Sequence, residues 1–139
     1  MMYIIGDIGN TLTKVCLIDH RSKIIKSYNV ETKKLINNRY LFLFLKKILK
    51  KKIEKKILFS SVVPKVFQKI KINLKKRNFI CLEIKNLALK KIIKIKVDNI
   101  KQLGSDRIAN AIGSYTSFKT NCLIVDFGTA TTFDIVKKS

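Results

Sequence analysis

One short pattern occurs twice in the chain, and it limits the possible folds more than any other feature. Residues 4–11 read IIGDIGNT and residues 123–130 read LIVDFGTA. Each copy has an apolar run, an aspartate, an apolar residue, a glycine and then small residues. An apolar segment follows each copy, which predicts two β-hairpins. A single Asp-Gly hairpin is commonly only a turn, but two in matching places indicate a duplicated structural unit.

The turn of such a hairpin suits one kind of ligand. Backbone N–H groups and hydroxyls bind phosphate oxygens, and the adjacent carboxylate holds the cation that neutralises them. The pattern therefore favours a nucleotide polyphosphate, although the chain has no Walker A motif. Gly9 and Asn10 are residues that are able to adopt positive φ angles in such a turn.

Hydrophobic periodicity predicts alternating strands and helices along the chain. The predicted strands, of which the first three form a meander, cover residues 3–6, 12–18, 23–30, 57–63, 79–83, 121–125 and 133–136. The predicted helices cover residues 37–56, the segment from Pro64 to Leu74, and residues 107–118. Proline suits the first turn of the second helix, and Ser105 is expected to cap the third.

The net charge of +21 first suggests a nucleic-acid-binding protein, which stays an alternative interpretation. However, the chain has 26 Lys against 4 Arg, together with 22 Ile and 10 Asn. These are residues of A/T-rich codons, so mutational bias explains the composition without a ligand. Nucleic-acid binders usually use arginine and interleaved aromatic residues, so we expect no specific nucleic-acid partner. The run Lys50-Lys51-Lys52 is interpreted as the solvated face of a helix.

Nine acidic residues stand out in this basic chain. Five of them are predicted to lie in or beside turns that contain Gly, Thr or Asn: Asp7, Asp98, Asp106, Asp126 and Asp134. Loops of this kind hold cations and phosphates, so these carboxylates are the candidates for chemistry. The other four are interpreted as ordinary surface acids.

Other residue types exclude several classes of protein. The three cysteines lie far apart with no CxxC pair, so a disulfide framework or a cysteine zinc site is not expected, and a reducing cytoplasm suits them. His20 is the only histidine, which argues against a Ser-His-Asp triad or a histidine metal site. No apolar run approaches the length needed to cross a membrane, and the N-terminus does not have the form of a signal peptide.

Four segments together resemble type III pantothenate kinases. They are DIGNTLTK (7–14), SSVVP (60–64), LGSDRIANAIG (103–113) and VDFGTATTFD (125–134). The resemblance implies an α/β fold of the actin-like superfamily of acetate and sugar kinases, with a mixed sheet in each RNase-H-like domain. It places a first such domain at residues 1–118 and the incomplete start of a second at residues 119–139. It also implies a cytoplasmic homodimer that uses ATP, Mg²⁺ and a potassium or ammonium ion to phosphorylate pantothenate, which is the first step of coenzyme A synthesis.

The resemblance also implies roles for individual residues. Asp106 is the implied general base, Asp126 the ligand of the monovalent cation, and Asp7 a holder of Mg²⁺ through the phosphates. The implied ATP contacts are Asp7, Ile8, Gly9, Asn10, Thr11, Leu12, Thr13, Lys14 and Thr129. The implied pantothenate contacts are Val97, Gly104, Ser105, Asp106 and Arg107. An arginine suits the carboxylate of pantothenate because its planar fork binds carboxylates through two hydrogen bonds.

The chain departs from the family pattern in two ways. Val97 and Ile100 stand where the family commonly has Tyr and Pro, and that Tyr is a substrate contact in relatives. The resemblance also covers only about the first half of a family member. An inactive, truncated or degenerate relative therefore stays an alternative to an active kinase. A hairpin without further strands would leave an apolar face open around residues 121–126.

Overall fold

The computed structural model describes residues 1–49, 53–128 and 130–138. By the density of contacts, the chain forms two compact units, Met1–Ile84 and Lys85–Ser139. Among the described residues, no helix is both long enough and apolar enough to cross a membrane.

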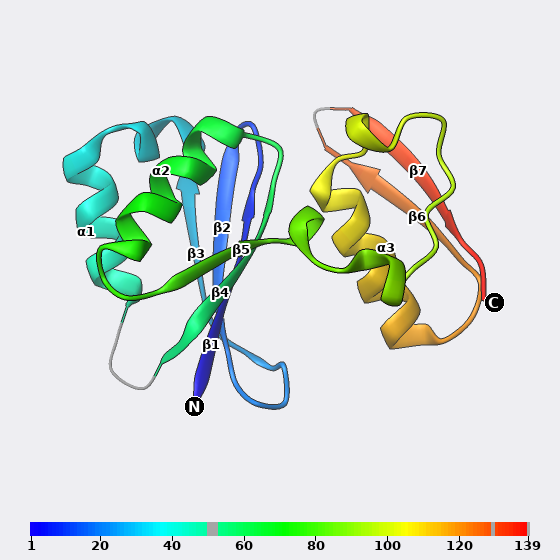
Figure 1. The fold of residues 1–139 in the computed structure, drawn as a ribbon, viewed down its shortest axis with the longest axis horizontal. Helices are drawn as coiled ribbons and strands as arrows, with labels where there is room; N and C mark the ends of the chain where they lie inside the picture. Colours follow the sequence, from blue (N-terminus) through cyan, green and yellow to red (C-terminus); the bar gives the residue numbers. More distant parts are fainter. Residues whose placement is uncertain (50–52, 129, 139) are drawn as a thin grey trace. The chain divides into compact units, whose positions relative to one another are not determined.

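The first unit is built on a five-stranded mixed sheet (Figure 1). Its strands are β1 (Met2–Ile8), β2 (Leu12–Ile18), β3 (Ile24–Glu31), β4 (Ile53–Ser61) and β5 (Ile80–Glu83), in the spatial order β3-β2-β1-β4-β5. Strands β1, β2 and β3 pair antiparallel, so the predicted meander is confirmed. Strands β4 and β5 join by parallel pairing, which requires a crossover through a helix.

Helices α1 (Asn38–Ile48) and α2 (Pro64–Lys75) lie on one side of this sheet (Figure 1). Their apolar stripes supply the core, with Leu41, Phe44, Leu45 and Ile48 from α1 and Val66, Phe67, Ile70 and Leu74 from α2. Pro64 occupies the first turn of α2, as predicted. The sheet therefore has a core face towards these helices and an outer face opposite to it.

Gly6 is required where the central strands β1 and β4 meet. A Cβ atom on Gly6 would lie 2.2 Å from the ring of Phe59, which is only 1% exposed and packs edge-on against Phe67. A side chain at residue 6 would therefore push the ring out of a close-packed core. The ring of Phe59 covers Gly6 on the core face, so the next residues along, Asp7 and Ser60, point to the outer face.

The helix predicted over residues 37–56 is too long. Helix α1 begins after Asn37, whose side-chain oxygen accepts a hydrogen bond from the N–H of Tyr40 at 3.0 Å, and it ends at Ile48. Ile53 instead starts β4, where it pairs with Met2. The apolar spacing through Ile53 fitted a helix, but pairing with β1 decides the conformation there. The predicted face at residues 50–52 lies outside the described residues.

The second unit contains the 3₁₀ turns η3 (Leu89–Lys91) and η4 (Ile100–Gln102), helix α3 (Ser105–Phe118), and the hairpin of β6 (Cys122–Phe127) and β7 (Thr131–Val136). Gly104, rather than Ser105, is the N-cap residue of α3, so the predicted cap is wrong by one residue. Ser105 is fully buried as the first helical residue. By contacts, α3 groups with the hairpin, whereas the predicted domain boundary after residue 118 separates them and stays a prediction.

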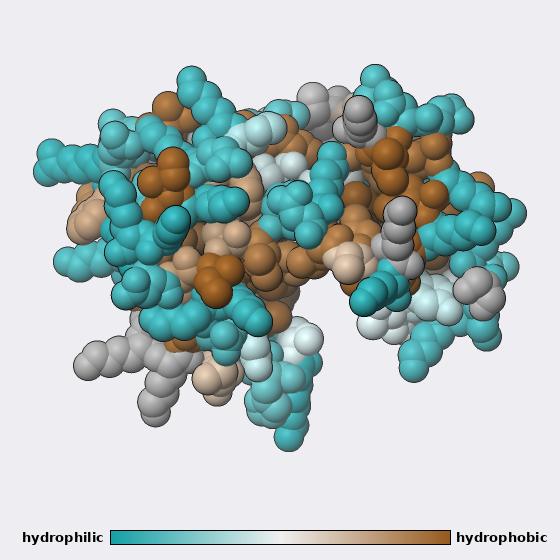
Figure 2. Space-filling model, in the orientation of Figure 1, coloured by the Kyte–Doolittle hydropathy of each residue, from teal (hydrophilic) through white to brown (hydrophobic). Residues whose placement is uncertain are grey.

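The sheet of the second unit has only two strands, and one face of it is exposed. Leu123, Val125, Phe127, Phe133 and Ile135 share that face and are between 38% and 83% exposed. The other face of the hairpin contacts α3. Figure 2 shows apolar residues, in brown, reaching the surface over this hairpin, among the hydrophilic side chains that cover much of the view.

Candidate functional site

The turn between β1 and β2 is closed by the N–H of Gly9, which donates to the carbonyl of Leu12 at 3.1 Å. Neither Gly9 nor Asn10 has a positive φ angle, so the turn does not use the left-handed conformation that these residues allow. Glycine is needed at position 9 for another reason: a Cβ atom there would lie 3.0 Å from the carbonyl oxygen of Leu12. The turn is therefore tight, and Asn10 and Thr11 are exposed at its tip.

Thr32 holds this turn from a distant part of the chain. Its hydroxyl donates to the carbonyl of Gly9 at 2.7 Å, and its N–H donates to the carbonyl of Thr11 at 2.9 Å. The hydroxyl of Thr13 lies 2.9 Å from that of Thr32. Because the single hydroxyl hydrogen of Thr32 is used on Gly9, Thr13 is the donor in this pair. Thr13 and Thr32 are both buried, so this network is shielded from water.

Burial separates the residues predicted to contact ATP in this turn. Ile8 and Thr13 are fully buried, so their side chains support the turn from the core side of the sheet. The exposed members of the predicted set are Asp7, Asn10, Thr11, Leu12 and Lys14, while Gly9 is half-buried. Direct contact with a ligand therefore stays a prediction chiefly for the exposed members.

Strand register places three polar residues side by side on the outer face of the sheet. Asp7 of β1 pairs with Lys14 of β2 on one side and with Ser60 of β4 on the other. Residues in register on neighbouring strands point to the same face, so these three form a row, here called the outer-face row. The row combines a carboxylate, an ammonium and a hydroxyl beside the Gly9–Leu12 turn.

The second hairpin repeats this arrangement in part. Asp126 takes the place of Asp7, two residues before Gly128, and the N–H of Gly128 donates to the carbonyl of Ala130 at 3.3 Å. Asp126 pairs with Thr132 across the hairpin and accepts a hydrogen bond from the side-chain amide of Asn110 at 3.2 Å. Thr129, the predicted phosphate contact, lies outside the described residues.

Asp134 lies in the middle of β7, so its predicted place in or beside a turn is wrong. Its carboxylate pairs with the guanidinium of Arg107 on α3, whose Nε lies 3.0 Å from each carboxylate oxygen. A hydrogen bond that Nη2 of Arg107 donates to Oδ1 of Asp134 completes the pair. This bonding to Asp134 raises the pKa of Arg107. The predicted arginine fork is thus already engaged by a neighbouring carboxylate.

Asp106 lies in the first turn of α3, where the helix dipole favours a negative charge. Its carboxylate accepts a hydrogen bond from the N–H of Arg107 at 2.8 Å and is partly accessible. Gly104 and Ser105 directly precede it. Val97, which is 43% exposed, lies in the irregular segment before η4. The structure therefore places all five predicted substrate contacts in the second unit.

An open cavity of about 520 Å³ lies between α3 and β6. Its lining includes Asn110, Gly113, Ser114 and Ser117 from the helix and Asp126 from the strand. A Cβ atom on Gly113 would meet nothing within 4 Å, because this residue borders open space. Asp126 is therefore approachable from one side while Asn110 orients its carboxylate.

The residues near Asp7 and Asp126, the aspartates of the two hairpins, are of the kind that binds hard cations. Oxygen donors are the preferred ligands of Mg²⁺, which usually keeps several waters and is bound through one or two carboxylates and substrate phosphates. Asp7 offers a carboxylate and Ser60 a hydroxyl, which fits that mode of binding. Within the described part of the chain, no group of three His, Cys, Asp or Glu side chains could hold a metal ion.

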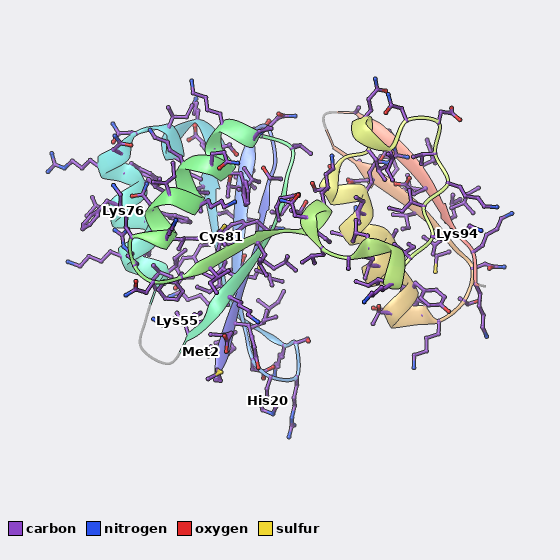
Figure 3. The ribbon with its side chains drawn as sticks, in the orientation of Figure 1. Met2, His20, Lys55, Lys76, Cys81 and Lys94 are labelled. Atoms are coloured by element: carbon purple, nitrogen blue, oxygen red, sulfur yellow. The ribbon has the colours of Figure 1, made fainter. Side chains whose placement is uncertain are left out.

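His20 is exposed in the turn between β2 and β3 (Figure 3).

Thr32, Asn110 and the role of Asp134 were not predicted. Each of them acts on a residue far away in the chain, as Thr32 does on Gly9 across 23 positions. No spacing in the sequence marks such a pair. The sequence marked only Asp134, as one of nine acidic residues, and this led to the wrong prediction of a place in or beside a turn.

The chain matches a family model described as type III pantothenate kinase over residues 3–139. A protein of that description from Pelagibacter ubique is 52% identical over 139 residues, which cover 99% of this chain and 55% of the relative. Another from Citrifermentans bemidjiense is 34% identical, covering 99% and 56%. The chain thus spans about half the length of the curated relatives it matches.

A ROK family protein from Streptococcus pneumoniae, solved with sucrose, has a similar fold, with a TM-score of 0.53 at 15% identity. This similarity covers 99% of the chain and 46% of that protein. The mixed sheet with its helices is thus an α/β fold, as expected, and it is shared with this ROK family protein. Because the family model matches the chain from residue 3 to residue 139, the chain belongs to the type III pantothenate kinase family.

Proposed function

We propose that the protein containing this chain transfers the γ-phosphoryl group of ATP to the hydroxyl of pantothenate, giving 4′-phosphopantothenate for coenzyme A synthesis. The observation that carries the proposal is the Gly9–Leu12 turn, held by Thr32 beside the exposed carboxylate of Asp7. A turn fixed in this way needs no reorganisation when charge develops on a phosphate, which is how protein groups stabilise phosphoryl transfer.

In this proposal, the first turn binds the polyphosphate of ATP. Asn10 and Thr11 donate hydrogen bonds at the tip of the turn, and Lys14 brings a positive charge to the phosphates. Asp7 holds Mg²⁺ through phosphates and water; when bound, the metal neutralises phosphate charge. Thr129 is proposed to make the corresponding contact from the second hairpin.

Asp106 is proposed to be the general base. The substrate hydroxyl attacks the γ-phosphorus, its proton passes to the Asp106 carboxylate, and ADP leaves with the electrons of the broken P–O bond. Arg107 is proposed to bind the substrate carboxylate. Its pairing with Asp134 fixes the guanidinium, and the remaining N–H groups are available for a second carboxylate.

Asp126 is proposed to hold a potassium or ammonium ion. Its carboxylate is oriented by Asn110 and borders the open cavity against α3, which leaves one side for a hydrated cation. The homodimer and the cytoplasmic location are further parts of the proposal that rest on the family resemblance.

Replacement of Asp106 tests the catalytic part of the proposal. Asp106→Asn keeps the size of the side chain but cannot accept the proton. In the whole protein, we expect it to lower turnover of ATP and pantothenate by at least about 100-fold, the usual contribution of a general base. MgATP binding, measured by calorimetry, should be unchanged.

Asp19→Asn is the control, because Asp19 lies in the turn between β2 and β3, outside the proposed site, and an asparagine there can still accept the hydrogen bonds of that turn. It should keep the turnover of the wild type. Undiminished turnover by Asp106→Asn would refute the assignment of the base. An inactive wild-type protein that still folds would favour the alternative of a degenerate relative.

A further inference from the structure

Ser60 has an unusual environment within the first unit. It is only 8% exposed, and its hydroxyl oxygen has no hydrogen-bond partner among the described residues. A buried polar group without a partner costs about 1–3 kcal/mol, so such groups are rare and usually signal a missing ligand or a functional role.

The strand register shows where this hydroxyl points. Ser60 pairs with Asp7 across β1 and β4, and it lies in the outer-face row on the side away from Phe59 and the helices. Its neighbour Ser61 differs, because the Ser61 hydroxyl accepts a hydrogen bond from the N–H of Val63 at 3.2 Å, just before α2. Ser61 therefore has a structural role at the strand end, whereas the Ser60 hydroxyl has none.

We infer that Ser60 is a binding residue for the Mg²⁺–polyphosphate group of ATP, donating its hydroxyl hydrogen to an oxygen of that group beside Asp7. The inference rests on the proposed function, and it gives a role to Ser60, for which the family resemblance implied none. A neutral donor fits this position because Asp7 and Lys14 already provide both charges of the row. Binding of the nucleotide would then satisfy the one buried side-chain oxygen or nitrogen that has no hydrogen-bond partner in the described part of the chain.

The test compares Ser60→Ala with Ser27→Ala in the whole protein. Ser27 lies on β3, two strands away from Asp7, and is exposed, so it is a matched control. We expect Ser60→Ala to weaken MgATP binding about tenfold, since a hydrogen bond to a charged group contributes about 1.5–3 kcal/mol. Ser27→Ala should bind MgATP like the wild type. Calorimetry gives both dissociation constants.

Thermal unfolding without nucleotide distinguishes a binding role from a structural one. Ser60→Ala removes an unpaired buried group, so the melting temperature should stay the same or rise. A serine that stabilised the fold would give a lower melting temperature. Ser60→Cys, which is close in size but a weak donor, should lose affinity in the same way and serves if the alanine variant does not fold.

Each result has a defined meaning. Unchanged MgATP affinity in both Ser60 variants, or a lower melting temperature with unchanged affinity, would overturn the inference while the proposed function stands. If the wild type binds MgATP and Ser60→Ala loses affinity, but pantothenate is not phosphorylated, the inference holds and the proposed function fails. A wild-type protein that binds no MgATP would overturn both.

Discussion

Thr32 is the residue on which the candidate phosphate turn most depends. Thr32→Val keeps the shape of the side chain but removes the donor to Gly9 and the acceptor for Thr13. Because the hydroxyl of Thr13 and the carbonyl of Gly9 lose this partner, we expect a loss of about 2 kcal/mol in the free energy of unfolding. Urea denaturation at 25 °C measures this loss.

A second threonine provides the control for that experiment. The hydroxyl of Thr116 also donates to a backbone carbonyl, that of Ile112 at 2.7 Å, but it is exposed on α3. Thr116→Val should therefore change stability by less than about 0.5 kcal/mol. Equal losses in the two variants would show that burial of the Thr32 network has no special effect.

Cys81 on β5 makes stability depend on pH (Figure 3). Burial raises the pKa of its thiol from 9.0 to about 11, an effect that nearby Lys71 partly opposes. Between about pH 9 and pH 11 the unfolded chain releases this proton while the folded chain keeps it. Stability therefore falls as pH rises through that window, by up to about 2 kcal/mol in total.

The measurement compares wild type with Cys81→Ala in urea titrations between pH 8.5 and pH 10.5. The variant is less stable at every pH because it lacks the buried sulfur, but its stability should depend less steeply on pH. Parallel curves for the two proteins would mean that Cys81 does not contribute to the pH dependence.

At the scale of elements, the hairpin of β6 and β7 presents an apolar face that no described strand or helix of the second unit covers. Leu123 pairs with Ile135 on that face, and both are more than 60% exposed. Exposed patches of this kind favour association. Replacing both residues with Thr, which keeps strand propensity, should reduce concentration-dependent association of the 139-residue chain.

Light scattering and binding of a fluorescent apolar dye measure the effect on the hairpin. Ile25→Thr is the control, because Ile25 is a similarly exposed strand residue in the first unit. We expect the double variant to lower both signals clearly and the control to change them little. A similar decrease in both variants would indicate that exposed isoleucines anywhere cause the association.

Local sequence patterns were enough to predict most helices and strands. They did not predict the residues at which these elements end or the elements with which they pair. Alternation and the proline at position 64 predicted the meander and α2 correctly. The end of α1 depended on the pairing of Ile53 with Met2, which is a long-range contact. The same holds for the candidate site. The motif pattern of the sequence predicted Asp7 and Gly9, but the hydrogen bond from Thr32 to Gly9 and the Arg107–Asp134 pair join residues that only the folded chain brings together.

At the scale of the whole molecule, the net charge of +21 is less informative about function than the positions of the few acidic residues. Hydrophilic side chains cover much of the face shown in Figure 2, and 26 of the 139 residues are lysines, whereas three of the nine carboxylates have defined hydrogen bonds within the second unit. Asp134 fixes Arg107, Asp126 accepts from Asn110, and Asp106 accepts from the first turn of α3. The carboxylates, rather than the lysines, are therefore the informative residues, as a background of A/T-rich composition predicts.

The most direct test of the account is product formation by the whole protein. Purified enzyme is incubated with ATP, Mg²⁺, potassium and pantothenate, and 4′-phosphopantothenate and ADP are quantified by mass spectrometry. We predict one phosphorylated product for each ADP, with product absent when pantothenate is omitted and reduced at least about 100-fold by Asp106→Asn. ADP release without phosphorylated pantothenate, from a folded protein that binds MgATP, would contradict the account.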